Sequence, residues 1–261
     1  QIGMAIDEYQ MDAFTVEASR ANESAPFAKT NVSKEELEKI NLGQDMPILL
    51  NQLTSVVTTS DAGAGVGYTG MRIRGSDASR INVTVNGIPL NDSESQGVFW
   101  VNMPDFASST QSIQVQRGVG SSSNGAGAFG ASVNLQSDVL KRKAYAQVSN
   151  SFGSFNTRKH SLQFGTGLIN NRFSFDGRLS ALHSDGYLDR ASADLRSYYF
   201  SAGYYGKKDV LRFITFAGFE ETYQSWWGTP QSRLENDVDG MNLHADNNGL
   251  TPSQRENLLN Y

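Results

Sequence analysis

The chain of 261 residues contains no cysteine. Disulfides, thiolate metal sites and cysteine nucleophiles are therefore excluded together, and the redox compartment is left open. Long apolar runs are also missing, since none approaches the ~20 residues that a membrane-spanning helix needs. Positive charge is scarce, because 22 basic residues against 27 acidic ones give a net charge of −5. Without a basic stripe for a phosphate backbone, nucleic acid is not an expected partner.

No pattern of a secretory leader precedes Gln1. The chain is then either a mature form from which a leader was cleaved or a soluble cytoplasmic protein. Its length is sufficient for one or two domains with a core of ordinary size.

Several short strand-like segments follow one another in the first half of the chain. The segments at residues 71–75 and 112–118 end in Arg-Gly, and the segment at 82–90 is interrupted by Asn86-Gly87. Because Asn-Gly accepts the positive φ of a type I′ turn, a hairpin is expected there. The inward residues of these strands are expected to be Ile73, Ile113, Val115, Val133 and Leu135.

Two short helices are predicted ahead of these strands. Ser33 and Glu36 have the spacing of a capping box, which opens a helix with Leu37 and Ile40 on one face. A second helix is expected around 47–53, where a proline occupies the first turn. Residues 29–137 therefore read as an α+β domain.

A Gly-x-Gly-x-x-Gly pattern occurs at Gly125, Gly127 and Gly130. Dinucleotide binding would need a strand before it and a helix after it, whereas serines precede it and a strand-like segment follows. These glycines are better explained as a sharp turn of the backbone.

The second half of the chain changes to a period of two. Between 172 and 184, apolar and polar side chains alternate, as they do at 159–169 and 197–206. Five strands are predicted, at 143–155, 157–169, 172–184, 196–206 and 210–224. A soluble sandwich would show the same alternation as a membrane barrel.

Turn lengths favour the barrel over the sandwich. Tight turns are expected at Asn170-Asn171 and at 206–209, and longer connections at 185–196 and after 224. Short turns at one rim and long loops at the other are typical of outer-membrane barrels. Tyrosines near strand ends fit the aromatic belts of such barrels: Tyr187, Tyr198, Tyr204 and Tyr223.

The order and spacing of these segments resemble the plug domain of TonB-dependent outer-membrane receptors, over about residues 12–227. One departure is Ala131, where the family usually has a second glycine in its Gly-Gly-Ser/Thr-Val-Asn word. The resemblance implies a flexible arm at 1–28, a plug domain at 29–137 and the first strands and loops of a 22-stranded barrel at 143–261. Five strands cannot close such a barrel, so the chain is expected to be the N-terminal portion of a longer polypeptide.

The resemblance also implies site residues. A TonB box, which would pair with the energising protein by strand addition, falls on Asp12, Ala13, Phe14, Thr15, Val16, Glu17 and Ala18. A latch between plug and inner wall would pair two plug arginines with two wall carboxylates: Arg74, Arg117, Glu220 and Glu221. Ligand contacts are expected from loop aromatics: Tyr68, Phe99, Trp100, Trp226 and Trp227.

The expected function is TonB-dependent uptake of a large scarce solute across the outer membrane of a Gram-negative bacterium. Family frequency favours an iron–siderophore or similar metal chelate, with cobalamin, a glycan or a peptide as alternatives. TonB, outer-membrane lipid, the extracellular solute and a surface lipoprotein are the partners considered.

Neither catalytic residues nor a cofactor or metal is expected. The calcium-like spacing of acidic residues from Glu235 to Asp246 departs from that pattern at both ends. The rivals are a passive β-rich adhesion protein and a soluble hydrolase using His183 and Asp185, for which no nucleophile elbow is present.

Overall fold

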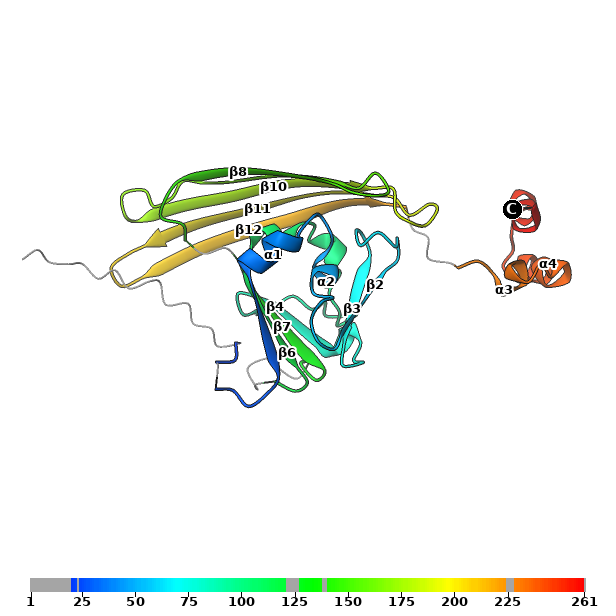
Figure 1. Ribbon diagram of the computed structural model, residues 1–261, viewed down its shortest axis with the longest axis horizontal. Coiled ribbons are helices and arrows are strands. Elements are labelled where there is room, and N and C mark those ends of the chain that lie inside the picture. Colours follow the sequence, from blue (N-terminus) through cyan, green and yellow to red (C-terminus); the bar gives the residue numbers. More distant parts are fainter. Residues whose placement is uncertain (1–19, 23, 121–126, 138–139, 224–227, 261) are drawn as a thin grey trace, which may run out of the picture. The chain divides into compact units, whose positions relative to one another are not determined.

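The computed structural model describes residues 20–22, 24–120, 127–137, 140–223 and 228–260 (Figure 1). The chain divides into two compact units, Gln1–Gln224 and Ser225–Tyr261. The first unit contains an α+β domain and a long antiparallel sheet, in the predicted order. The domain boundaries given above stay predictions.

The α+β domain is built on a sheet whose strands have the order β1-β6-β7-β4-β5. Its strands are β1 (Lys29–Ser33), β4 (Ile81–Val85), β5 (Ile88–Pro89), β6 (Thr110–Arg117) and β7 (Ala131–Ser137). Only β4 and β7 pair in parallel within it. A separate hairpin joins β2 (Val56–Ser60) to β3 (Thr69–Ile73).

Short helices cover one face of this sheet. They are α1 (Lys34–Ile40), α2 (Met46–Leu49) and the 3₁₀ turns η1 (Ala78–Arg80), η2 (Trp100–Asn102) and η3 (Phe106–Ser109). The capping box is confirmed, because Ser33 Oγ accepts from the Glu36 amide while the Glu36 carboxylate accepts from the Ser33 amide. The hairpin is confirmed too, with positive φ angles at Asn86 (51°) and Gly87 (81°).

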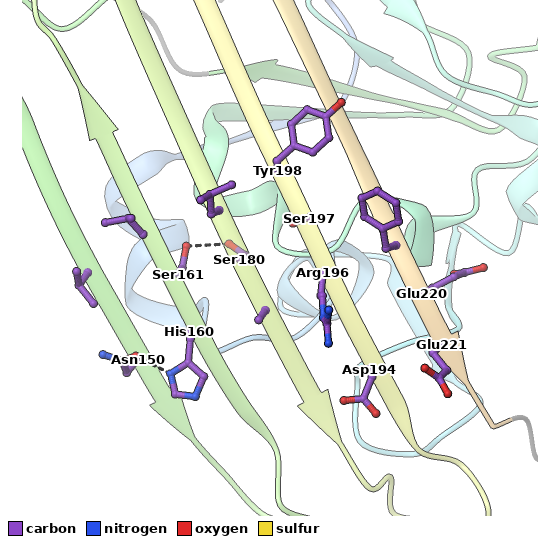
Figure 2. A pocket seen from close by; sticks show the side chains of 15 residues that line it. Asn150, His160, Ser161, Ser180, Asp194, Arg196, Ser197, Tyr198, Glu220 and Glu221 are labelled. Carbon is purple, nitrogen blue, oxygen red and sulfur yellow. Dashed lines mark hydrogen bonds between the residues drawn. The ribbon is translucent and has the colours of Figure 1, made fainter.

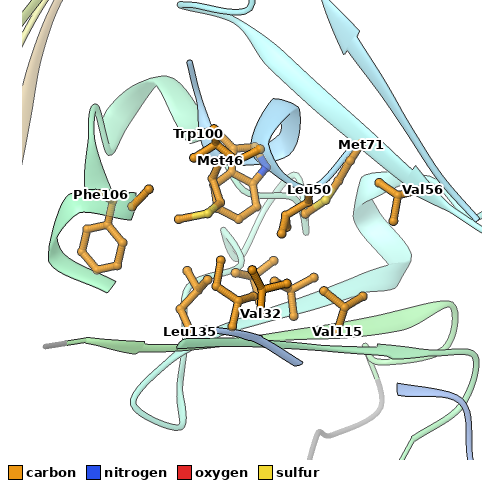
Figure 3. Packing of buried hydrophobic residues seen from close by; sticks show 14 of the residues in the cluster. Val32, Met46, Leu50, Val56, Met71, Trp100, Phe106, Val115 and Leu135 are labelled. Carbon is orange, nitrogen blue, oxygen red and sulfur yellow. The ribbon is translucent and has the colours of Figure 1, made fainter. Parts of the chain in front are cut away.

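The core of the domain lies between the sheet and these helices (Figure 3). All five predicted inward residues, from Ile73 to Leu135, are at most 1% exposed, which confirms them. Leu37 is buried as expected, but Ile40 at the end of α1 is 38% exposed. The helix is only two turns long, so its last residue projects past the core.

Five antiparallel strands follow the α+β domain, as predicted. They are β8 (Tyr145–Phe152), β9 (Arg158–Gly165), β10 (Phe173–Ser184), β11 (Ala193–Tyr205) and β12 (Val210–Thr222), paired in chain order. Asn170 and Asn171 both have positive φ at the tight turn before β10. Because β11 begins at Ala193, the connection from β10 is shorter than predicted.

The two faces of this sheet differ in chemistry. Along β10, Ser174, Arg178 and Ser180 face inward and are buried, while Phe175 and Leu179 lie on the exposed outer face. The predicted alternation is therefore present, and its polar side is the side that meets the α+β domain.

The second unit contains α3 (Gln231–Leu234), α4 (Val238–Asn247) and α5 (Pro252–Asn260). Met241 and Ala245 are buried within it. Asp237, part of the calcium-like spacing, instead caps α4 by accepting from the Gly240 amide at 3.0 Å. No helix among the described residues has the length and apolar content to cross a membrane.

Replacing Ile113 by alanine should lower the free energy of unfolding by about 3 kcal/mol, because the cavity would open in the fully buried face of β6. Ile88→Ala is the matched control, since Ile88 is 69% exposed and its loss should cost less than about 0.5 kcal/mol. Urea unfolding of the two variants measures the difference. Equal midpoints would contradict this placement of the core.

Candidate functional site

A buried cluster of three charges joins the α+β domain to the strand sheet. Asp105 Oδ1 lies 2.6 Å from Lys159 Nζ, and Asp105 Oδ2 lies 3.2 Å from Arg178 Nη1. All three side chains are at most 3% exposed. One carboxylate of the domain thus binds two cations of the sheet, with one oxygen for each.

Local structure explains how these residues meet. Asp105 lies between η2 and η3 with a φ of 53°, a left-handed conformation that aspartate adopts more readily than most residues. Lys159 on β9 and Arg178 on the neighbouring β10 both face inward. The turn therefore places the carboxylate at the surface of the domain, facing the adjacent strands β9 and β10.

Hydroxyl and amide groups complete the coordination of the cluster. Asp105 also accepts hydrogen bonds of 2.5 Å from Ser108 Oγ and Ser180 Oγ. Lys159 Nζ donates to Asn41 Oδ1 at 3.0 Å, and the network is extended by Ser109, Ser197 and the Pro104 carbonyl, which contact Arg178. Buried charges stabilise a contact only when their remaining hydrogen-bonding groups are satisfied in this way.

The carboxylate is ionised at neutral pH. Burial alone would raise the pKa of Asp105, but Arg178 and Lys159 outweigh it and bring that pKa down to about 2. Removing Asp105 would leave two cations without a counter-charge in the interior.

Close apolar packing surrounds the cluster. The Phe106 ring lies 5.0 Å from that of Phe216 on β12 and 6.3 Å from that of Tyr199 on β11. Gly218 of β12 is required nearby, because a Cβ atom there would come within 2.5 Å of the Asn102 carbonyl oxygen. The domain and the sheet therefore meet backbone against backbone at this point.

The segment 61–68 forms a second contact with the sheet. Tyr187, in the connection between β10 and β11, donates its amide to the Ala62 carbonyl at 2.7 Å. Tyr68 meets Glu220 of β12, and burial, then the charge and hydrogen bond of Glu220, raise the pKa of the Tyr68 hydroxyl. Next to the end of this segment, the Asp45 carboxylate accepts a hydrogen bond of 3.0 Å from Thr69 Oγ1, which fixes its position.

The predicted latch is not formed. Glu220 faces inward, but its neighbour Glu221 pairs with Asp194 on the outer face, so an inner-wall role for Glu221 is wrong. Within the described residues, no ion pair joins Arg74 or Arg117 to either glutamate.

Arg74 instead lies beside the Arg117-Gly118 segment, whereas Arg117 bonds to β1. Arg117 Nη1 donates to Thr30 Oγ1 at 2.6 Å. Arg74 Nη1 lies 3.1 Å from where a Cβ of Gly118 would be, and Gly118 has a φ of 88°. A side chain at Gly118 would therefore be strained and would crowd the Arg74 guanidinium.

The predicted ligand residues have different surroundings. Trp100 is 5% exposed and belongs to the core, because the turn η2 folds it inward, so its prediction as a ligand contact is wrong (Figure 3). Phe99 is exposed and lines a hollow of about 310 Å³ with Leu90 and Phe216. Trp226, Trp227 and the predicted TonB box at 12–18 lie outside the described residues.

The segment after the predicted TonB box is bonded to the polar face of the α+β sheet. Arg20 donates to Ser112 Oγ at 2.9 Å and to the carbonyls of Ser112 and Asn134 at 3.0 and 3.1 Å. The Ala21 amide donates to Gln114 Oε1 at 2.7 Å, and Gln114 Nε2 donates back to the Ala21 carbonyl at 3.0 Å.

Sequence reasoning missed the Asp105 cluster. The alternation between 172 and 184 puts Arg178 on the polar side of its strand but indicates no partner for it. The available signal was a charged residue on the inward side of a strand, at Lys159 and at Arg178, which demands a buried counter-charge.

The hydrolase alternative finds no support in the surroundings of His183. Its ring atoms lie 2.7 Å from Asp194 and 3.0 Å from Asp185, two exposed carboxylates, with Asn156 as a third neighbour. None of these partners carries a nucleophilic hydroxyl.

An α+β domain held against the polar inner face of an antiparallel sheet, whose outer face is apolar, defines a plug-and-barrel architecture. Residues 21–132 match the family model of the TonB-dependent receptor plug domain. These residues therefore form a plug domain of the TonB-dependent receptor type, and the strands that follow share their fold with solved receptors. No curated protein sequence matches the chain.

Solved structures of such receptors share this fold. The siderophore receptor PirA from Acinetobacter baumannii superimposes with a TM-score of 0.59 at 17% identity, over 74% of this chain and 32% of that one. The pyoverdine receptor FpvA from Pseudomonas aeruginosa gives 0.62 at 13%, over 80% and 30%. The copper transporter OprC gives 0.63 at 15%, over 78% and 33%. The chain thus spans about a third of the length of these proteins.

Asp45 should make the stability of the plug depend on pH. Burial raises the pKa of Asp45 to about 7, against hydrogen bonds from Thr69 and the Gly67 amide. Because the folded pKa exceeds the unfolded value of about 3.9, this group contributes fully below pH ~4, and its contribution is lost as the pH rises through 7. Asparagine at position 45 stays neutral at every pH. The Asp45→Asn variant should therefore lose up to about 4 kcal/mol less free energy of unfolding than wild type over this pH range.

Urea unfolding between pH 4 and pH 8 measures this effect. Asp61→Asn, an exposed carboxylate in the adjacent segment, controls for the loss of one negative charge. Parallel pH profiles for wild type and Asp45→Asn would contradict the prediction.

Proposed function

We propose that this chain is the N-terminal part of a TonB-dependent active transporter in the outer membrane of a Gram-negative bacterium. The observation that carries the proposal is the plug domain held on the inner face of the barrel strands through Asp105, Lys159 and Arg178. A domain anchored in this way would obstruct the lumen of a closed barrel. Solute would pass only when the plug is displaced or rearranged.

The energy for that rearrangement would enter through the N-terminal arm. Residues 12–18 are proposed to add as a strand to TonB, whose pull would act on the Arg20 and Gln114 bonds and then on β1, an edge strand of the plug sheet. Edge strands and single side-chain bonds yield more easily than the buried core. The Asp105 cluster would hold the rest of the plug against the wall while the arm end moves.

The solute is proposed to be a metal chelate. The structural relatives are named as receptors for a siderophore, pyoverdine and enterobactin, and as a copper transporter. Phe99 and Tyr68, on loops of the plug, are proposed ligand contacts, and Trp226 and Trp227 stay predictions. Transport breaks no bond in the solute, so no catalytic role is assigned to any residue. A surface lipoprotein partner also stays a prediction.

Deleting residues 12–18 from the full-length receptor should abolish energised uptake and leave binding of the chelate at the cell surface unchanged. The assay compares uptake of radioiron-labelled pyoverdine and enterobactin with and without a protonophore. Replacing residues 2–8 by a Gly-Ser sequence of equal length is the control, and it should transport normally. Accumulation that ignores both the deletion and the protonophore would instead support a passive adhesion or interaction protein.

A further inference from the structure

Residues 61–68, which join β2 to β3 in the hairpin of the plug (Figure 1), are seated on the strand sheet. The amides of Tyr187 and Leu188, in the connection between β10 and β11, both donate to the Ala62 carbonyl, at 2.7 and 3.3 Å. Val66 is 1% exposed and packs against side chains of β10 and β11. A backbone contact and one apolar side chain therefore hold this segment in place.

The backbone of the segment depends on three glycines. Gly63, Gly65 and Gly67 have φ angles of 72°, 75° and 98°, which other residues adopt only with strain. A Cβ atom at Gly63 would also come within 2.9 Å of Tyr187 Cβ. Because glycine has many alternative conformations, contacts from outside the segment must select the seated one.

Asp45 supplies such contacts from beneath the segment. It occupies the N-cap position of α2 but makes no side-chain bond to that helix. Its carboxylate accepts instead from Thr69 Oγ1 at 3.0 Å and from the Gly67 amide, and its own amide donates to the Gly65 carbonyl at 2.9 Å. One residue, 4% exposed, thus bonds the end of the segment at three points.

The Asp45 carboxyl is buried without a counter-charge. Burial raises the pKa of Asp45 to about 7, against the hydrogen bonds from Thr69 and Gly67, and among the described residues no cation lowers it further. The titratable groups on the elements packed around it have other surroundings: Asp61 and Arg72 are exposed, Lys159 is bound to Asp105, and Tyr68 meets Glu220.

The protonation state of this carboxyl therefore bears on the position of the segment. A neutral carboxyl is tolerated in the interior, whereas an ionised one without a cation is costly there and gains solvation when the segment opens. Tyr68, at the end of the segment, meets Glu220, which lies beside Glu221 on β12 (Figure 2). Seating of the segment consequently sets the position of the Tyr68 hydroxyl.

We propose that Asp45 holds residues 61–68 against the strand sheet while its carboxyl is neutral and releases them when the carboxyl ionises. The assignment of Tyr68 to the solute site rests on the function proposed above, whereas the contact between Asp45 and the segment does not. In that function, Asp45 is a positioning residue that acts through the segment. The solute site is then more completely formed at pH 6 than at pH 8.

Hydrogen exchange of the full-length receptor in detergent, followed by mass spectrometry at pH 6 and pH 8, tests the proposal. Exchange is expressed relative to the intrinsic amide rate at each pH. A pKa of about 7 in the seated state and about 3.9 in the open state changes the closing equilibrium about tenfold between these conditions. In wild type, the protection of residues 61–68 should therefore be about tenfold lower at pH 8, while that of the core strand β6 stays the same.

Three variants make the test specific to Asp45. Asp45→Asn should abolish the pH difference in residues 61–68. Thr69→Val should widen it, because the hydrogen bond that it removes favours the ionised carboxyl. Asp61→Asn, which removes an exposed carboxylate of the same segment, is the matched control and should keep the tenfold difference.

Two results would overturn the proposal. A pH difference that persists in Asp45→Asn would show that another group controls the segment. An equal loss of protection in residues 61–68 and in β6 would show that Asp45 affects only the global stability of the plug. Exchange is measured without transport, so failure of energised uptake would count against the proposed function and leave this result standing.

Discussion

The ion cluster of Asp105 with Lys159 and Arg178 is the constraint on which the arrangement of this molecule depends. Without it, the inner face of the sheet would present two buried cations with no counter-charge, a state that proteins avoid. With it, two wall strands and one turn of the plug share a single carboxylate. The polarity is opposite to the predicted latch, since here the plug provides the acid and the wall provides the bases.

The two faces of the strand sheet differ in the side chains that they present. Inward side chains such as Ser180, Ser197 and Arg178 act as hydrogen-bonding partners for the plug. Outward side chains such as Phe175 and Leu179 form an exposed apolar surface, which suits the bilayer of the proposed location. One segment therefore presents two chemically different faces, and the period of two in its sequence keeps them apart.

Much of the fold could be predicted from sequence because the decisive signals are local. The capping box at Ser33, the Asn86-Gly87 turn and the inward residues of β6 each depend on neighbours a few positions away. The cluster around Asp105 could not be predicted in this way, because its partners lie 54 and 73 positions further along the chain. Only the folded topology brings β9, β10 and the η2–η3 turn together.

The errors at the site have equally specific causes. Glu220 and Glu221 are adjacent on one strand, so alternation forbids both from facing the lumen. The sequence pattern places Trp100 in a loop, but the short η2 turn buries it in the plug core. Both errors concern the direction of a side chain, which composition alone does not determine.

A double-mutant cycle between Asp105 and Lys159 tests the central claim most directly. The free energies of unfolding of the full-length receptor would be compared for Asp105→Asn, Lys159→Gln and the double variant. A direct buried contact predicts a coupling energy of at least about 1.5 kcal/mol, since the second substitution removes a charge already left without its partner. Additive effects, within about 0.5 kcal/mol, would show that the two side chains do not meet and would contradict the account.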